Sequence, residues 1–114
     1  MIIIHAKNSD TTYKKLKKHK LEYNNLLKIL DVIDNIDSFN ELLLLPQAKL
    51  YGFEHLKHDM SDFYSFNLCK NKGTIRLIVK PKENNIVEIY LITISFKHYQ
   101  DFDPRRVNYY EWEI

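Results

Sequence analysis

Three residue types that cleavage of a phosphodiester requires lie near the ends of two predicted strands in the last third of the chain. Arg76 stands alone among the apolar residues of segment 74–79, and His98 and Tyr99 follow the long apolar segment 86–96. A guanidinium can hold a phosphate with two hydrogen bonds, and an imidazole, with an unperturbed pKa of ~6.5, can transfer protons near neutral pH. A phenol can stack on a base or donate to a phosphate. This set favours phosphodiester chemistry.

Each of these residues also has a purely structural interpretation. Arg76 would form an ion pair with Glu88 across the sheet. His98 would be a solvated histidine at a strand end, and Tyr99 would pack its ring at the sheet edge. The residues alone leave both interpretations open.

Metal and disulfide chemistry are not expected. His55 and His58 are three residues apart, but no carboxylate or cysteine stands at a spacing that would complete a ligand set, so no metal and no cofactor is predicted. Cys69 is the one cysteine, which excludes an internal disulfide and fits a reducing compartment.

The length of 114 residues is enough for one core, so we expect a single domain over residues 1–114 with a C-terminal tail at residues 105–114. No run approaches the ~20 apolar residues that a membrane-spanning helix needs. Residues 2–4 are too short an apolar run for a signal peptide. The expectation is a cytoplasmic protein without a membrane partner.

Charge is unevenly distributed although the net charge is only +2. Residues 1–28 are basic, residues 29–66 are acidic, and residues 67–100 are basic again. If the fold brings the two basic blocks together, they would form a surface that faces phosphate groups. A solvated helix face explains such a run equally well.

The elements that must position these residues follow from hydrophobic periodicity. We expect a strand at residues 2–6 and a helix from residue 11 to about 35, with a break at 19–21 that would make two helices. Ser38 and Glu41 have the spacing of a capping box before a short helix that stops at Pro46.

Beyond Pro46 the pattern changes. Residues 47–57 are predicted to be partly extended, with Gly52 at a bend. Apolar residues with period two then predict strands at 63–69, 74–80 and 86–96, joined by turns at 71–73 and 81–85. Gly73 is expected to supply a positive φ in the first of these turns.

This order predicts an α+β fold. Two or three N-terminal helices would pack on one face of a mostly antiparallel, four-stranded sheet. The first strand must pair with one of the last three, and the long apolar strand is expected inside the sheet. Arg76 and His98-Tyr99 can converge only if the last two strands pair in antiparallel register, which would make the site a groove along the sheet face, extended toward Lys57.

Four ordered segments, spread over about half of the chain, carry a resemblance to a known family. They contain Leu56-Lys57, Tyr64-Ser65-Phe66-Asn67, Ile75-Arg76-Leu77-Ile78 and His98-Tyr99. In type, order and spacing they resemble the RelE/ParE superfamily of toxins from bacterial type II toxin–antitoxin systems. The chain departs from the family at Asn67, where a second arginine is common, and at Ile75, where a tyrosine is common.

The resemblance implies a RelE-like fold and a function. Members such as RelE, HigB and YoeB are mRNA interferases, which cleave messenger RNA on the ribosome without metal by attack of the RNA 2′-hydroxyl. It implies catalytic roles for His98, Tyr99, Arg76 and Lys57, and substrate-binding roles for Lys97, His55, Glu54 and Arg105. Glu54 or His55 would supply a second proton-transfer group.

The implied partners are a cognate antitoxin, the ribosome and messenger RNA, and the lysine-rich residues 14–20 could touch ribosomal RNA. Tyr109, Tyr110 and Trp112 would either stack on RNA or pack on the sheet. Two other functions stay open: a ParE-like inhibitor of DNA gyrase, and a RelE-like binding module without activity, which Asn67 would favour.

Overall fold

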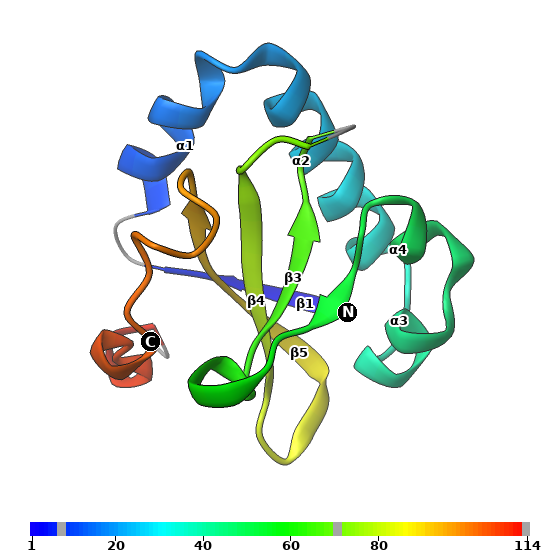
Figure 1. Ribbon diagram of the computed structural model, residues 1–114. Coiled ribbons are helices and arrows are strands. Elements are labelled where there is room, and N and C mark those ends of the chain that lie inside the picture. The colour runs from blue at the N-terminus through cyan, green and yellow to red at the C-terminus, as the bar shows by residue number, and fades with distance from the viewer. Residues whose placement is uncertain (7–8, 70–71, 113–114) are drawn as a thin grey trace.

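A mixed sheet of five strands, in the order β1-β5-β4-β3-β2, forms the centre of the described chain (Figure 1). The structure is a computed structural model that describes residues 1–6, 9–69 and 72–112. The strands are β1 (Ile2–His5), β2 (Glu54–His55), β3 (Tyr64–Asn67), β4 (Arg76–Lys82) and β5 (Asn85–Ser95). The α+β class is confirmed.

Pairing of the strands is mostly antiparallel, as predicted. Strands β2, β3, β4 and β5 pair antiparallel in succession, whereas β1 pairs parallel with β5. The long apolar strand therefore lies inside the sheet, between β1 and β4. The fifth strand, β2, lies in the segment 47–57 that was predicted to be partly extended. Its pairing with the sheet was not predicted, because two residues are too few to show a period-two pattern.

The N-terminal half contains four α-helices among the described residues, which exceeds the predicted two or three. They are α1 (Ser9–Lys17), α2 (Lys20–Asp34), α3 (Phe39–Leu44) and α4 (Pro46–Leu50). The break between α1 and α2 confirms two helices in the first segment. None of these helices is long and apolar enough to cross a bilayer.

The sequence around Pro46 both ends one helix and begins the next. The Glu41 amide donates to Ser38 Oγ at 3.3 Å, and the Glu41 carboxylate accepts from the Asp37 amide at 2.9 Å, so the predicted cap of α3 is confirmed. The prediction of an extended segment after Pro46 is wrong for α4. Proline lacks only an amide that is unpaired in a first turn, so Pro46 can begin a helix.

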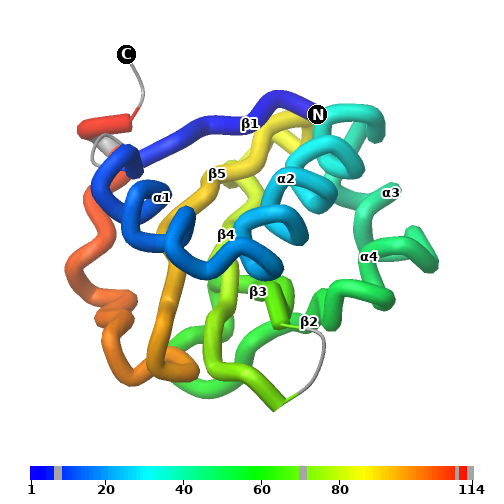
Figure 2. The backbone as a smooth tube through the Cα atoms, turned by 90° about the horizontal axis from the view of Figure 1, so that it is seen from above, coloured from blue at the N-terminus to red at the C-terminus, as the bar shows by residue number. Residues whose placement is uncertain are grey.

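All four helices cover one face of the sheet (Figure 2). The buried core on this side includes Leu26, Ile29 and Ile33 of α2 and Leu77 and Val79 of β4. Alternate residues of a strand point to opposite faces. The sheet must therefore bury a second set of side chains on its other face.

That second core is covered by the C-terminal segment, which contains the 3₁₀ turns η2 (Pro104–Arg106) and η3 (Tyr109–Glu111). The rings of Tyr109 and Trp112 lie with their centroids 4.9 and 5.4 Å from that of Tyr90 in β5. Of the two predictions for the tail aromatics, packing on the sheet is the observed one for these two residues. The Tyr110 side chain lies outside the described part.

Two glycines are required for different reasons. Gly52 has a φ of +64°, and a Cβ on it would lie 2.9 Å from Asn67 Cβ. Gly73, by contrast, does not have the predicted positive φ. A Cβ there would lie 2.2 Å from Cys69 Sγ, so Gly73 is needed for close approach. The rest of the predicted 71–73 turn lies partly outside the described residues.

Replacement of Gly52 by alanine is expected to lower the free energy of unfolding by about 2 kcal/mol, because the left-handed conformation is unfavourable for alanine and the methyl group crowds Asn67. Urea denaturation measures this change. Asn84→Gly is the control, since Asn84 has a φ of 59° in an exposed turn. We expect a change within about 0.5 kcal/mol there. An equal, small change in both variants would contradict the assignment.

Candidate functional site

The candidate site lies on the sheet face away from the helices, where β4 begins and β5 ends. Arg76 pairs with Asn67 of β3 on one side and with Ser95 of β5 on the other. Ile78, two residues along β4, belongs to the second core, so Arg76 points to the same face. The antiparallel register that the convergence of Arg76 with His98-Tyr99 requires is therefore present.

The Arg76 side chain is half-buried and held from one edge. Its Nη1 donates to Asn67 Oδ1 at 2.9 Å, to the Gly73 carbonyl at 2.8 Å and to the Ile75 carbonyl at 3.2 Å. Its Nε and Nη2 have no hydrogen bond to any described residue. A guanidinium fixed at one nitrogen and open at the other two is oriented for a two-point contact with an oxyanion.

The alternative interpretation of Arg76 is wrong. Glu88 forms its ion pair with Lys82, at 3.0 Å, and not with Arg76. No carboxylate of the described residues pairs with the guanidinium. Asn67, where the chain departs from the family pattern, accepts a hydrogen bond from Arg76. Because its amide is neutral, it holds the guanidinium without cancelling its charge.

Tyr99 is fixed at both ends. Its hydroxyl hydrogen-bonds Ser65 Oγ at 2.7 Å and Glu54 Oε1 at 3.4 Å, and its backbone amide donates to Ser95 Oγ at 2.8 Å. Burial is the main cause that raises the pKa of Tyr99, and the negative charge of Glu54 adds to it, while the Ser65 bond and the positive charge of Arg76 oppose it. The phenol therefore keeps its proton to a higher pH than an ordinary tyrosine does.

His98 and Tyr99 are consecutive residues with positive φ, at 52° and 74°. This left-handed conformation costs about 1–2 kcal/mol for each residue with a side chain. Strain of this kind concentrates at functional sites, where the surrounding contacts over-determine the backbone. The His98 amide donates to the Thr74 carbonyl at 3.0 Å, which ties this turn to the strand that carries Arg76.

The structural interpretations of His98 and Tyr99 each agree with part of what the structure shows. The His98 side chain is exposed, as a solvated histidine would be. The Tyr99 ring is half-buried and packs against the second core, as an edge residue would. Neither observation argues against a catalytic role, because the imidazole of His98 is accessible and the phenol of Tyr99 makes polar contacts on the same face.

Of the predicted binding residues, Glu54 and Lys97 lie at the site. Glu54 pairs with Ser65 across β2 and β3 and reaches the Tyr99 hydroxyl. Lys97 is exposed beside His98. Lys57 is exposed two residues beyond β2, just before the 3₁₀ turn η1 (His58–Met60), and no contact joins it to the other site residues.

Two predicted binding residues lie elsewhere. His55 stacks on Tyr64 with ring centroids 4.4 Å apart, and Tyr64 packs at 4.9 Å on Phe39 of α3, so His55 is directed to the helix side of the sheet. Arg105 forms an ion pair with Asp103 at 3.1 Å.

The surroundings of Arg105 do not favour a phosphate. It lines a pocket that also contains the carboxylates of Asp59, Asp62 and Asp103. The Asp103 bonds and the charges of Asp103 and Asp59 raise the pKa of Arg105 despite the weak opposing effect of desolvation. The three carboxylates would repel an anion there.

Two residues of the candidate site were not singled out from the sequence, and Asn67 was noted only as a departure from the family pattern. Ser65 is fully buried and binds the Tyr99 hydroxyl, Ser95 is 1% exposed and binds the Tyr99 amide, and Asn67 binds Arg76. A polar residue on an otherwise apolar, fully buried stretch was the available signal for both serines.

The two basic blocks of the sequence meet beside this site. Lys15 of α1 places its Nζ 4.5 Å from the centroid of the Phe96 ring, and the His19 ring lies 5.9 Å from the same ring. Helix α1 therefore borders the turn that carries Lys97 and His98. The two basic blocks therefore approach each other at this point, which is the condition for a shared surface that faces phosphate groups.

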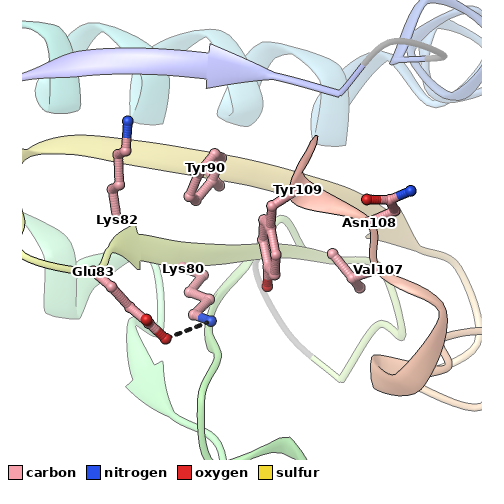
Figure 3. Close-up of a pocket in the computed structure, with 7 residues that line it drawn as sticks. All are labelled: Lys80, Lys82, Glu83, Tyr90, Val107, Asn108 and Tyr109. Carbon is pink, nitrogen blue, oxygen red and sulfur yellow. Dashed lines mark ion pairs between the residues drawn. The ribbon is translucent and has the colours of Figure 1, made fainter. Parts of the chain in front are cut away.

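A pocket of about 390 Å³ elsewhere on the same face does not belong to the site (Figure 3). It lies between the far ends of β4 and β5 and the C-terminal segment. Its lysines are paired with carboxylates, Lys80 with Glu83 at 3.5 Å and Lys82 with Glu88 at 3.0 Å. Within the described ranges, no group of three or more His, Cys, Asp or Glu side chains is arranged to hold a metal ion.

Comparison with known proteins identifies the fold. No protein-family model and no curated protein sequence matches the chain. Among solved structures, the chain is similar to a YoeB/ParE toxin from Agrobacterium tumefaciens, with a TM-score of 0.57 and 15% sequence identity, over 84% of this chain and 98% of that one. The chain therefore has the fold of the RelE/ParE toxins, as its sequence segments predicted.

Alkaline pH is expected to destabilise the wild-type protein more than a Tyr99→Phe variant. Because the pKa of Tyr99 is raised in the folded state, the folded protein keeps a proton that the unfolded chain releases above its ordinary value of 10.0. The folded state then binds more protons, so stability falls as the pH rises through this range. Urea unfolding at about pH 9 and about pH 11 measures the slope. An equally steep loss in the variant would contradict the assignment.

Proposed function

We propose, from a fold shared with RelE/ParE toxins and from the chemistry of the site, that the protein is the toxin of a type II toxin–antitoxin pair. We further propose that it is an endoribonuclease which cleaves messenger RNA on the ribosome. The observation that carries this proposal is the convergence of Arg76, Tyr99 and Glu54 on one sheet face, beside the exposed His98.

The reaction is attack of the RNA 2′-hydroxyl on the adjacent phosphorus. Glu54 is the general base: it takes the proton as the bond from the 2′-oxygen to phosphorus forms. The bond from phosphorus to the 5′-oxygen breaks, and His98, in its protonated form, gives a proton to that oxygen. The products are a 2′,3′-cyclic phosphate and a free 5′-hydroxyl, so no metal, water or oxidant enters the balance.

Arg76 and Tyr99 act on the phosphate. The open edge of the Arg76 guanidinium binds the non-bridging oxygens, where negative charge grows in the transition state. The Tyr99 hydroxyl donates to the same group or orients Glu54. Since Asn67 and Ser65 fix these two side chains, little reorganisation is needed when the substrate binds.

In this proposal, ribosomal RNA provides a phosphate-rich surface that a messenger RNA alone does not provide. Lys97 precedes His98 in the chain, Lys15 lies over the ring of Phe96, and the lysines of α1 continue the positive surface away from the site. Such a surface attracts the phosphates of ribosomal RNA and orients the site toward the message. Lys57 would extend the same surface along the other edge, and a cognate antitoxin would act by covering it.

The competing functions have less support from the geometry. An inactive binding module was favoured by Asn67, but Asn67 holds the one arginine that the proposed chemistry needs. Inhibition of DNA gyrase requires no strained turn that exposes an imidazole next to a fixed phenol. Gyrase inhibition would show itself as altered DNA supercoiling in induced cells.

Loss of the acid or the cation is expected to abolish cleavage. In cells induced for the wild type, new 5′ ends should appear in messenger RNA on ribosomes. His98→Ala should lower the cleavage rate by ~10²–10⁴ through loss of proton transfer, and Arg76→Ala by ~10²–10³ through loss of charge stabilisation. Mapping of 5′ ends, with growth as a second readout, measures both.

Two matched variants test specificity. His58 is an exposed histidine with a φ of 59°, and Arg106 is an exposed arginine, so His58→Ala and Arg106→Ala should cleave like the wild type. If the wild type yields no new ends, the nuclease proposal fails, and altered DNA supercoiling would indicate gyrase. If His98→Ala and Arg76→Ala stay fully toxic, the site assignment fails although the toxin class stands.

A further inference from the structure

A continuous chain of hydrogen bonds crosses the turn formed by residues 96–102. Asp101 Oδ1 accepts from Ser95 Oγ at 2.5 Å, and Asp101 Oδ2 accepts from the Phe96 amide at 2.9 Å. Ser95 Oγ in turn accepts from the Tyr99 amide at 2.8 Å. The hydroxyl of Ser95 has one hydrogen, which it donates in the bond to the Asp101 carboxylate. The lone pairs of the Ser95 oxygen are therefore left to accept from the Tyr99 amide.

We infer that Asp101 is a positioning residue for the proposed nuclease site, because through Ser95 it holds Tyr99 and His98 in the conformation in which they face the substrate. This inference rests on the proposed function. Asp101 itself reaches neither Glu54 nor Arg76, so it acts only through the turn.

The backbone of the turn needs such a device. His98 and Tyr99 both have positive φ, which residues with side chains rarely adopt in succession. The bonds that Asp101 organises close the turn on its β5 side, and the His98 amide closes it on the β4 side through the Thr74 carbonyl at 3.0 Å. Without the carboxylate, the turn would relax toward negative φ and carry both side chains away.

Only an ionised carboxylate can make these contacts together. Burial acts to raise the pKa of Asp101, but the bonds from Ser95 and Phe96 and the nearby positive charge of Lys15 outweigh it, so the pKa is lowered. Asp101 therefore accepts two hydrogen bonds at neutral pH. An amide of the same shape has one acceptor and would have to donate to Ser95 or to leave Phe96 unpaired.

The effect on chemistry follows from where Tyr99 is held. Its hydroxyl is fixed by Ser65 and lies 3.4 Å from Glu54 Oε1, while its amide is fixed by Ser95. A side chain held at both ends keeps its hydroxyl beside the base. If the Tyr99 amide is released from Ser95, the phenol is chemically unchanged but is no longer aligned with Glu54. A small misplacement of this kind lowers the reaction rate strongly.

The test uses the full chain in single-turnover cleavage of messenger RNA on purified ribosomes. Asp101→Asn should lower the maximal rate at least about tenfold while the ribosome concentration for half-maximal rate stays within about twofold. Asp103→Asn, two residues away, should match the wild type on both measures. Ser95→Ala should lower the rate similarly, and the double variant should be no slower than the slower single variant, because both changes break one chain of bonds.

Amide hydrogen exchange of the folded proteins gives a readout that does not depend on cleavage. The Tyr99 and Phe96 amides should be protected in the wild type and in Asp103→Asn, and should lose protection in Asp101→Asn. If the wild type does not cleave, the proposed function fails, and this protection pattern still decides the role of Asp101. Equal protection of Tyr99 in wild type and Asp101→Asn, or an unchanged cleavage rate, overturns the inference. Should Asp101→Asn not fold, Ser95→Ala decides it by the same two measurements.

Discussion

The antiparallel pairing of β4 with β5 is the constraint on which the rest of the molecule depends. It places Arg76 opposite Ser95, and it continues past the strand ends through the bond from the His98 amide to the Thr74 carbonyl. The two strands bury side chains on both faces, under the helices and under the C-terminal segment. A strand pair that packs on both sides is fixed by contacts on each face.

Irregularities in this pairing align the site. The register shifts between Ile78 and Val79 and between Pro81 and Lys82, where extra residues are accommodated. If the two strands paired without these shifts from the turn at residues 83–84 onward, Arg76 would not lie opposite Ser95. Bulges of this kind re-aim side chains near functional sites. The register, and not the sequence distance from the turn, therefore sets which groups converge.

The sequence anticipated the parts of the fold that repeat with a clear period. It predicted the two helices of the first segment, the three long strands and the antiparallel site geometry. It missed α4 and the pairing of β2 with the sheet, because an element of two or five residues shows no period and Pro46 can either stop or start a helix. It misplaced His55, since the face of a strand this short depends on pairing that only the fold defines.

The residues of the candidate site also fall into two groups, those that the sequence predicted and those that it did not. Arg76, His98 and Tyr99 stood out because their chemistry is unusual beside apolar strands. The residues that hold them did not, since Ser65, Ser95 and Asn67 gain their meaning only from partners distant in the chain.

The pattern of charges explains why these supports are neutral. A carboxylate beside Arg76 would hold it equally well, but the ion pair would cancel the charge that a phosphate needs. Asn67 and two backbone carbonyls hold the guanidinium with dipoles only. The one ionised support near the turn, Asp101, faces Ser95 and Phe96 and is placed behind the strained backbone. The negative charge of Asp101 thus stabilises the backbone of the turn. The carboxylate beside the Tyr99 hydroxyl is Glu54, at the position where the proposed reaction needs a proton acceptor.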